Sequence, residues 1–499
     1  MITILPHASE TIQHQIDRAV LLDEFKTFLP RASIISEKEA LKPFECDGLS
    51  AYCCVPWLVV LPETVEQIQR ILRFCHRQGV PVVARGAGTG LSGGAVPLAN
   101  GVLLSLAKLN QILEIDIANR LAVVQPGVRN LAVSQAVAPH GLYYAPDPSS
   151  QIACTIGGNV AENSGGVHCL KYGLTTHNVL RVKILTMDGE LVTIGSHGLD
   201  GTGLDLLALM VGSEGMLGII VEATVKLLPI PEQAQVVLAA FDDIEKAGQA
   251  VAEIIAAGLI PAGLEMMDKA AILAVEDFIH AGYPKNAEAI LLCELDGIRE
   301  QVEEELGKAV ALLTDSGAIE VRVAQSEHER QKMWAGRKSA FPAAGRVSPD
   351  YYCMDGTIPR RFLAKMLKEI GELSEKYGLA VANVFHAGDG NLHPLILYNA
   401  NHAGELEKAE QLGGDILKLS VEVGGTITGE HGVGVEKINH MCIQFADNEL
   451  TQFHAVKRAF DEKGLLNPGK AVPTLHRCAE LGAMHVHQGE VAHPELDRF

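Results

Sequence analysis

The sequence predicts an α+β protein with two main domains. The chain has 499 residues, which is more than one hydrophobic core usually organises. Short extended patterns and glycine-rich loops run from Trp57 to about Pro231, and longer alternating helices and strands follow. We therefore expect four segments: an N-terminal segment over 1–56, a first domain over 57–231, a second domain over 232–474 and a C-terminal tail over 475–499.

The first domain begins with a strand, a helix and a second strand. The apolar runs 57–62 and 80–86 predict strands, and residues 64–79 carry apolar side chains at helical spacing. Further along, Asp188 and Gly189 separate the extended runs "VLRVKILTM" and "ELVTIG". This pattern predicts a β-hairpin, because an Asp-Gly pair adopts the tight turn that joins two antiparallel strands.

The second domain alternates longer elements. We expect strands at 236–241, 289–295 and 319–324, with helices between them at 244–258 and 300–317. Such alternation after the glycine-rich first domain favours a separate α+β domain.

The composition excludes several classes of function. The formal net charge is −20 at pH 7, so a nucleic-acid partner would be repelled. No uninterrupted apolar run approaches the roughly 18 residues of a membrane span, and "MITILPHASE" lacks the features of a signal peptide. We expect a cytoplasmic protein without a transmembrane segment. No C-x-x-C pattern occurs among the 10 cysteines, so we expect no iron–sulfur cluster in this chain.

A glycine-rich loop, "RGAGTGLSGG", follows the second predicted strand. Its Gly88-x-Gly90-x-x-Gly93 spacing matches the fingerprint of dinucleotide-binding Rossmann folds, and Asp116 lies further along. That fold requires a helix that opens at the last glycine and crosses back over the sheet. Here the next predicted strand, "VLLSL", begins about eight residues later, which is too short for such a crossover. We expect either a loop whose backbone N–H groups bind a pyrophosphate directly or a flexible loop without a ligand.

Two further stretches of small residues favour a ligand. They are "PDPSSQIACTIGGNVAENSGG" (Pro146–Gly166) and "GSEGMLGII" (Gly212–Ile220). Small residues let the backbone approach a flat ligand closely. Three such stretches in one domain indicate one large dinucleotide.

The second domain carries two histidines on a glycine-rich turn. "FHAGDGNLHP" (Phe385–Pro394) places His386 and His393 seven residues apart, between the extended runs "LAVANVF" and "PLILY". Glycines on both sides of Asp389 favour a tight turn, so we expect both imidazoles to point to one place. Alone, such histidines are more often surface or hydrogen-bonded groups than metal ligands.

A second motif supplies a carboxylate. "TGEHGVG" (Thr428–Gly434) offers Glu430 beside His431, again between glycines. Two imidazoles and one carboxylate form a ligand set suited to Zn²⁺, Mn²⁺ or Fe²⁺, and three protein ligands leave open positions for a substrate. The two motifs together indicate a divalent metal site with a catalytic role.

Several motifs in order resemble one flavoprotein family. "PWLVVLP", "PVVARGAGTGLSGGA", "YAPDPSS", "IGGNVAENSGG" and "GSEGMLGI" resemble the FAD-binding domain of the vanillyl-alcohol oxidase and PCMH flavoproteins. "FECDGLSAY", "GLEMMD", "SPDYYCMDGTIPRR", "ITGEHG" and "LLNPGK" extend the resemblance over nearly the full length, to the D-2-hydroxyacid dehydrogenase branch and its FAD-linked glycolate oxidase subunits. The resemblance implies a PCMH-type FAD-binding domain followed by a ferredoxin-like α+β cap that lies over the flavin.

The resemblance implies that the first domain binds FAD. No histidine lies within "RGAGTGLSGG", so we expect the flavin to be noncovalent. The residues expected to contact FAD are Arg85, Gly86, Ala87, Gly88, Thr89, Gly90, Ser92, Gly93, Pro146, Asp147, Ser149, Ser150, Thr155, Gly157, Gly158, Asn159, Glu162, Asn163, Gly165, Glu214, Gly218, Ile219 and Asn467. The "NPGK" segment (Asn467–Lys470) is expected to return to the FAD-binding domain.

The resemblance also implies roles for the histidine motifs. His386, His393 and Glu430 would bind the divalent metal, and His431 would act as the catalytic base. This division agrees with the chemistry, because oxidation of a hydroxyl-bearing carbon requires loss of the O–H proton and transfer of hydride to flavin. Arg337 would hold the carboxylate of the substrate, since a guanidinium makes a planar two-point contact.

The sequence gives no specific catalytic role to other residues near these motifs. Lys338 is expected to be solvated, because adjacent helical residues diverge. Tyr351, Tyr352 and Asp355 are either pocket residues or core residues.

One departure from the family pattern bears on the size of the substrate. Relatives that act on 2-hydroxyglutarate are expected to carry an asparagine and a lysine where Leu395 and, approximately, Cys353 stand here. The groups that would hold a second carboxylate are therefore missing. This favours short monocarboxylates: glycolate, oxidised to glyoxylate, and D-lactate, oxidised to pyruvate.

The resemblance further implies a larger complex. Electrons would pass to a second flavoprotein-like subunit and an iron–sulfur subunit, and through them to membrane quinone. Attachment to the inner face of the cell membrane would come through these partners. Two alternatives remain: a stand-alone D-lactate dehydrogenase, and a non-catalytic metal- or nucleotide-binding regulator.

The tail is rich in histidine. It carries His476, Cys478, His485, His487 and His493. Their spacings match no common zinc site. Apolar residues lie among them, so we expect a segment that docks on a partner subunit rather than a second metal site.

Overall fold

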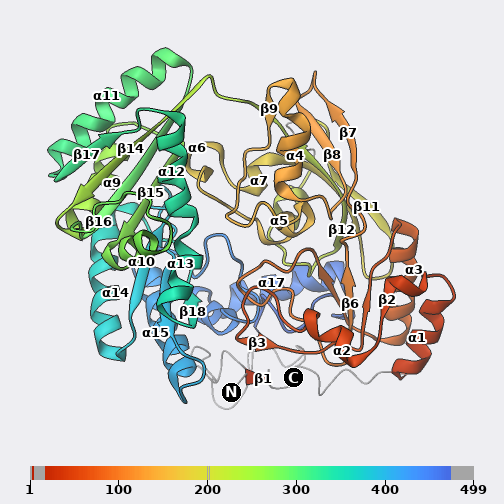
Figure 1. Cartoon of the computed structure of the whole chain (residues 1–499). Helices are drawn as coiled ribbons and strands as arrows, with labels where there is room; N and C mark the ends of the chain where they lie inside the picture. The colour runs from red at the N-terminus through yellow and green to blue at the C-terminus, as the bar shows by residue number, and fades with distance from the viewer. Residues whose placement is uncertain (1–2, 5–16, 199–200, 202, 474–499) are drawn as a thin grey trace.

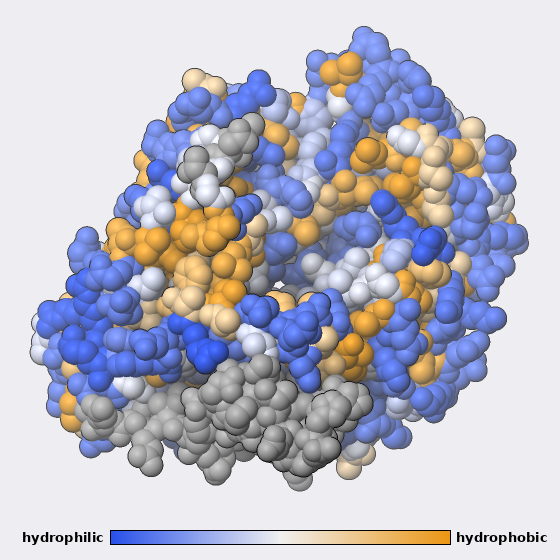
Figure 2. All heavy atoms as spheres, turned by 180° about the vertical axis from the view of Figure 1, so that it is seen from behind, coloured by the Kyte–Doolittle hydropathy of each residue, from blue (hydrophilic) through white to orange (hydrophobic). Residues whose placement is uncertain are grey.

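Three large sheets organise the chain (Figure 1). The computed structural model describes residues 3–4, 17–198, 201 and 203–473. The tail with its histidines and Cys478 lies outside the described residues. Two of the sheets belong to an N-terminal lobe and the third to a C-terminal lobe. Seen from behind, the surface is hollowed between the lobes (Figure 2).

The first sheet holds the strand, helix and strand that the sequence predicts after Trp57. Helix α3 (Val65–Gln78) begins after Thr64, whose hydroxyl accepts a hydrogen bond from Gln67 N, and ends at Gly79 with φ 70°. The strands, in sheet order, are β2 (Ile34–Ile35), β4 (Leu58–Val60), β6 (Val102–Ser105) and β5 (Val82–Arg85). The prediction of this unit is confirmed.

The glycine-rich loop joins β5 to β6. All residues between these strands are described and none is helical, so the prediction that no helix opens at Gly93 is confirmed. The two strands are nevertheless parallel neighbours. The whole loop, residues 86–101, therefore forms the crossover, and helical hydrogen bonds do not use its backbone N–H groups. Apart from the N–H groups of Ala95, Val96 and Gly101, which are hydrogen-bonded within the protein, these groups are available to a ligand.

The second sheet is antiparallel and contains the predicted hairpin. Strand β10 (Val179–Leu185) pairs with β11 (Leu191–Gly195) across the turn at Asp188 and Gly189. The remaining strands, in order, are β12 (Ile219–Lys226), β8 (Leu121–Val124) and β7 (Ile112–Asp116). Helix α5 (Ile156–Glu162), from the second stretch of small residues, packs against β12.

The third sheet has seven antiparallel strands with helices on both faces. Alternate residues of strand β14 (Gln233–Phe241) point to different cores: Val237 and Ala239 to one, Val236 and Leu238 to the other. One face carries α9 (Ile244–Ala256), α11 (Arg299–Asp315), α14 (Leu363–Tyr377) and α15 (Glu405–Glu422), and the other α10 (Lys269–Ile279), α12 (Glu327–Lys338) and α13 (Ala340–Val347). The strand order is β17 (Glu320–Val323), β14, β16 (Ala289–Gly297), β15 (Gly263–Asp268), β19 (Val381–Phe385), β20 (Pro394–Tyr398) and β18 (Asp350–Cys353).

The chain returns to the N-terminal lobe after helix α17 (Asp447–Phe460). Asn467 N donates a hydrogen bond to Val82 O at 2.9 Å. The side-chain amide of Asn467 donates to the carbonyl oxygens of Gly94 at 3.0 Å and Glu214 at 2.7 Å. The predicted return of the "NPGK" segment is confirmed, and its first residue lies fully within the N-terminal lobe.

Candidate active site between the two lobes

A cavity of about 600 Å³ opens between the two lobes, and we call it the junction cavity. Its walls in the N-terminal lobe come from the glycine-rich loop and from residues 148–164 and 214–220. Its walls in the C-terminal lobe come from α12, α13, β18 and the two histidine motifs. A volume of this size is typical of ligand-binding sites.

Most residues predicted to contact FAD line the junction cavity. They are Arg85, Gly86, Ala87, Gly88, Thr89, Gly90, Ser149, Ser150, Thr155, Gly157, Gly158, Asn159, Glu162, Glu214, Gly218 and Ile219. The other predicted residues do not line it: Ser92, Gly93, Pro146, Asp147, Asn163, Gly165 and Asn467. Ser92 O, for example, accepts a hydrogen bond from Val435 N at 3.0 Å, and Asn163 ends helix α5 at φ 54°. Contact of these residues with FAD stays a prediction.

Two glycines show why this wall is built from small residues. A Cβ atom on Gly157 would lie 2.6 Å from Pro126 Cβ, and one on Gly86 would overlap the hydroxyl of Thr155. Backbone therefore forms the surface at both positions. The hydroxyl of Thr155 is buried and has no hydrogen-bond partner within the described residues. An unpaired polar group beside a cavity fits a polar ligand such as a dinucleotide.

The histidine turn lies between β19 and β20, which pair antiparallel as predicted. His386 N donates to Asn391 O at 3.1 Å, and Gly390 has φ 85°, where a side chain would collide with Ile358 O. The ring centroids of His386 and His393 are 4.9 Å apart. The prediction that this turn brings both imidazoles to one place is confirmed.

Glu430 from the second motif completes a cluster with these histidines. Its Oε1 lies 3.3 Å from Nε2 of His386 and 3.3 Å from Nε2 of His393. One ligand atom of each side chain lies within 4.8 Å of the other two. The ring of His393 is buried, and neither of its nitrogens has a hydrogen-bond partner in the described part of the chain. Such an unpaired imidazole, beside a second imidazole and a carboxylate, fits a divalent cation.

The charges in this cluster agree with cation binding. Burial opposes ionisation of Glu430, but the neighbouring His386 lowers its pKa to about 2. Burial also disfavours charge on His386, yet Glu265 and Glu430 raise its pKa well above the usual value. The pKa of His393 is lowered by burial and by His431 nearby, so this ring stays neutral. The space between His386 and Glu430 thus attracts positive charge, from a proton or from a metal ion.

Glu265 on β15 supports the cluster from behind. Its Oε1 accepts a hydrogen bond from Nδ1 of His386 at 2.8 Å, so Nε2 of that ring faces Glu430. A carboxylate that fixes the tautomer of a histidine in this way is typical of metal sites. Sequence reasoning missed Glu265, although an acidic residue inside the apolar run "GLEMMD" is a signal that could have found it.

Arg337 lies against the same carboxylate. Its Nε donates to Glu265 Oε2 at 2.7 Å, and its Nη2 lies at the same distance. The side chain is 2% exposed and does not line the junction cavity. Its contact with a substrate carboxylate therefore stays a prediction. Lys338, the next residue, is exposed as predicted, but it also forms part of the cavity wall.

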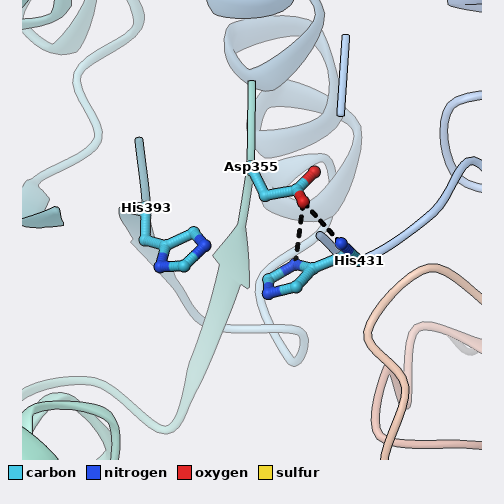
Figure 3. Close-up of side chains that lie close together, drawn as sticks. All are labelled: Asp355, His393 and His431. Carbon is cyan, nitrogen blue, oxygen red and sulfur yellow. Dashed lines mark hydrogen bonds and ion pairs between the residues drawn. The ribbon is translucent and has the colours of Figure 1, made fainter. Parts of the chain in front are cut away.

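His431 lies close to His393 and Asp355 (Figure 3). Its ring stacks on that of His393 with centroids 4.9 Å apart and 9° between the planes. Its Nε2 is 3.9 Å from Glu430 Oε1, and its Nδ1 is 3.9 Å from Asp355 Oδ2. Burial lowers the pKa of His431 despite the nearby Asp355 and Glu430. A buried neutral imidazole next to a cation site is suited to accept a proton.

Asp355 holds the "TGEHGVG" loop in place. One carboxylate oxygen accepts hydrogen bonds from Gly429 N at 3.1 Å, Glu430 N at 2.8 Å and His431 N at 2.7 Å. The other oxygen lies 3.0 Å from Nζ of Lys437. Burial opposes its ionisation, but Lys437 and these donors leave the pKa of Asp355 below its usual value. Asp355, His393 and His431 also lie close enough to share a metal, but the donors already occupy the Asp355 carboxylate, which favours the His386 cluster.

The other two weak candidates from the sequence, Tyr351 and Tyr352, lie in different environments. Tyr351 lines the junction cavity. Tyr352 is buried in the core, and its hydroxyl lies 3.4 Å from that of Tyr52.

Glu214 connects the same loop to the N-terminal lobe. Its buried carboxylate accepts hydrogen bonds from Val433 N at 2.7 Å and Gly434 N at 2.6 Å. The loop that carries Glu430 and His431 is therefore held by a carboxylate from each lobe.

Comparisons with known proteins decide the family. Residues 56–195 match the family described as "FAD binding domain", and residues 230–471 match "FAD linked oxidases, C-terminal domain". The chain is 64% identical to the glycolate oxidase subunit GlcD of Escherichia coli (strain K12), over 97% of each chain. The chain belongs to the FAD-linked oxidases. A D-lactate dehydrogenase of Anaerostipes hadrus is 33% identical to this FAD-linked oxidase, with 90% of this chain and 96% of that protein covered.

The fold of this FAD-linked oxidase has solved counterparts. The crystal structure of p-cresol methylhydroxylase with substrate bound matches it with a TM-score of 0.77 at 16% identity, over 92% of this chain and 97% of that chain. The expected α+β class, with a PCMH-type FAD-binding domain and a cap, is confirmed. FAD is the cofactor of the N-terminal lobe. Among the described residues, none of the helices combines the length and apolar character that a membrane crossing requires.

Proposed function

We propose that this FAD-linked oxidase is the flavin-binding catalytic subunit of an enzyme that oxidises glycolate to glyoxylate and D-lactate to pyruvate. The observation that carries the proposal is the cluster of His386, His393 and Glu430. Its last two members line the junction cavity together with His431 and the glycine-rich wall. The relatives support the substrate class, since one is named a glycolate oxidase subunit and another a D-lactate dehydrogenase.

The residues of the two walls would hold two groups. The glycine-rich wall, over a domain that we propose to span 57–231, would bind FAD noncovalently. When bound, FAD would accept the hydride that leaves the carbon of the hydroxy acid. In the cap, over 232–474, the imidazoles of His386 and His393 and the carboxylate of Glu430 would hold Zn²⁺, Mn²⁺ or Fe²⁺. When bound, the cation would lower the pKa of the substrate hydroxyl.

The chain's own side chains would then orient the substrate and move its proton. His431 would accept the hydroxyl proton at Nε2, because its Nδ1 faces Asp355. Glu265 would keep Nε2 of His386 directed at the cation. Arg337 would bind the substrate carboxylate with the part of its guanidinium that Glu265 does not occupy.

Two buried residues support a short substrate. Leu395 and Cys353 are partners across β20 and β18, and both are buried. They offer no charge or amide for a second carboxylate. We therefore propose a preference for two- and three-carbon monocarboxylates over 2-hydroxyglutarate.

The electrons would leave through other proteins. We propose a second flavoprotein-like subunit and an iron–sulfur subunit as partners, with membrane quinone as the acceptor reached through them. The name of the Escherichia coli relative, a subunit, supports assembly with other chains. Cytoplasmic location, with attachment to the inner face of the cell membrane through these partners, follows from the same proposal.

Reduction of the bound flavin tests the proposed reaction. The purified protein is expected to be yellow and to lose its colour when glycolate or D-lactate is added without oxygen. 2-Hydroxyglutarate is the control that is expected to act poorly. A flavin that no 2-hydroxy acid reduces would point to the binding-protein alternative, and reduction by D-lactate alone would point to a D-lactate dehydrogenase.

A further inference from the structure

A second cavity, of about 350 Å³, lies where the two lobes meet beside α12, and we call it the side cavity. Its lining consists of Val167, His168, Glu294, Arg330, Gln331, Trp334, Ala335 and Lys338. The first two precede α6 (Cys169–Tyr172), Glu294 lies on β16, and the others lie on α12. Figure 1 shows α6 and α12 at the boundary between the lobes.

Most charges of the side cavity are paired with one another. Glu294 Oε1 lies 3.3 Å from Nε2 of His168, and Glu294 Oε2 accepts a hydrogen bond from Arg330 at 2.9 Å. Nδ1 of His168 lies 2.8 Å from Asp147 Oδ2. Arg330 also donates to Glu327 at 2.8 Å. These groups form a polar wall whose opposite charges largely cancel.

Lys338 is the exception in this wall. Its side chain is exposed, and within the described residues it makes no hydrogen bond or ion pair. It is also the one residue that the linings of the side cavity and the junction cavity share. An unpaired cation therefore stands in the walls of both cavities.

The proposed reaction requires a way in for a small anion. FAD would occupy the part of the junction cavity that the glycine-rich stretches line, which leaves the cap side of the cavity for the entry of the substrate. The cap wall includes Phe341, Tyr351 and His431 as well as Lys338. The side cavity, at the boundary between the lobes, shares Lys338 with this wall.

We propose that the side cavity is the entrance for the substrate, and that Lys338 is a positioning residue that binds the carboxylate of a small 2-hydroxy acid as it enters. This inference rests on the proposed function, because an anionic substrate is what a free cation at this place would attract. The ammonium group of a lysine is a point charge on a flexible stem, which suits a transient contact. Arg337, its neighbour on α12, is buried and held by Glu265, which suits the final contact. The carboxylate passes from the exposed cation to the buried one.

The first test replaces the charge of Lys338 in the flavin-loaded enzyme. Stopped-flow flavin reduction is measured at increasing glycolate concentration for Lys338→Met and Lys338→Arg. For Lys338→Met we expect the second-order rate constant for reduction at low glycolate to fall about 10-fold, the lower end of what electrostatic attraction contributes to entry, and the half-saturating concentration to rise by the same factor. The saturating rate, the FAD content and the metal content stay as in the wild type. Lys338→Arg keeps the charge and most of this rate constant.

Two controls separate the entrance from a general charge effect. Lys332→Met removes an exposed lysine of the same helix that lines neither cavity, and it is expected to change nothing. Added salt is expected to raise the half-saturating concentration of the wild type and to have little effect on Lys338→Met, because the screened charge is already gone.

The second test narrows the side cavity itself. Ala335 is exposed and lines the side cavity alone, so Ala335→Phe is expected to lower the rate constant for reduction at low glycolate several-fold and to leave the saturating rate unchanged. Unchanged kinetics in both Lys338→Met and Ala335→Phe would overturn the entrance. A lower saturating rate for Lys338→Met at unchanged half-saturation would also overturn it, because Lys338 would then act in the chemical step. A wild type that no 2-hydroxy acid reduces would overturn the proposed function and the entrance together.

Discussion

The two ends of the junction cavity are built in opposite ways. In the FAD-binding domain the wall is backbone, and glycines such as Gly86 and Gly157 stand where an added Cβ would collide with a neighbour. In the cap the wall is made of side chains with charges or lone pairs, above all His393, Glu430 and His431. The first wall recognises a ligand by its shape and by N–H groups, and the second by a matched set of chemical groups.

This difference determines which changes each wall tolerates. A backbone wall loses its fit when a side chain grows by one carbon, but it does not depend on the identity of many side chains. A side-chain wall keeps its shape after a conservative substitution but loses its chemistry. The following experiments test whether damage to one wall leaves the other intact.

Removal of a metal ligand is expected to have the largest effect. His386→Ala or His393→Ala removes one of the three proposed ligands, and a cation bound there would stabilise the reacting oxygen by several kcal/mol. We expect glycolate-dependent flavin reduction to fall by about 10³-fold or more, with metal lost and FAD retained. Metal analysis and the flavin spectrum measure the two outcomes. His402→Ala, at an exposed histidine of the cap, is the matched control, and full metal content in the ligand variants would refute the site.

Loss of the base is expected to come next. His431→Ala removes the imidazole that would accept the hydroxyl proton, and a positioned base usually contributes roughly 10²–10⁴-fold to the rate. Both FAD and metal are expected to remain, because His431 is not one of the three proposed ligands, His386, His393 and Glu430. Rapid-reaction measurement of flavin reduction, together with metal analysis, checks this. Loss of the metal would show that His431 is itself a ligand.

Glu265→Gln tests the carboxylate that supports His386 within the cap. The glutamine has nearly the same shape but no charge, so His386 loses the carboxylate that orients its ring. We expect metal affinity to fall about 10-fold to 100-fold, as is usual for such supporting residues, and activity to return when excess metal is added. Glu288→Gln, at an exposed carboxylate of the same lobe, is the control for metal titration. Equal affinity in the two variants would remove Glu265 from the site.

Arg337→Lys is expected to affect substrate binding. The charge remains, but a single ammonium group cannot make the planar two-point contact of a guanidinium. We expect KM for glycolate and for D-lactate to rise alike, by about 10-fold, since both substrates present the same carboxylate. Steady-state assays with a dye acceptor give both values. A change confined to one substrate would separate Arg337 from the carboxylate.

Gly157→Ala tests the backbone wall and is expected to have the smallest effect on the chemistry. Its Cβ would lie 2.6 Å from Pro126 Cβ, and such overpacking lowers the free energy of unfolding by about 1–3 kcal/mol. FAD content is expected to drop while metal affinity stays unchanged. Gly371→Ala, in α14 with no neighbour within 4 Å, is the control and is expected to stabilise the fold slightly. Loss of metal in Gly157→Ala would show that the two walls are not independent.

Local patterns predicted the parts of the molecule whose determinants are close in the sequence. Helix α3, the Asp188-Gly189 hairpin and the histidine turn were predicted because an apolar run at helical spacing, a turn pair or a glycine-flanked motif marks each of them. The parallel pairing of β5 and β6 was not expected, because the length argument counted only the residues after Gly93, whereas the whole loop forms the crossover.

The supporting carboxylates could not be predicted in the same way. Glu265 stands 121 residues before His386, and Asp355 stands 75 residues before Glu430. No local pattern connects residues so far apart, and only the folding of the cap sheet brings them together. The ligands of a site thus appear in motifs, while the groups that orient these ligands come from elsewhere in the fold.

The loop from Thr428 to Gly434 has a consequence for attempts to exchange caps among FAD-linked oxidases. Its N-terminal half is bound by Asp355 of the cap, and its C-terminal half by Glu214 of the FAD-binding domain. A cap grafted onto a foreign FAD-binding domain would bring Asp355 along but would leave Glu214 behind. A chimera would therefore place His431 correctly only if its host supplied a carboxylate at the position of residue 214, so the choice of host is restricted by one side chain outside the transplanted part.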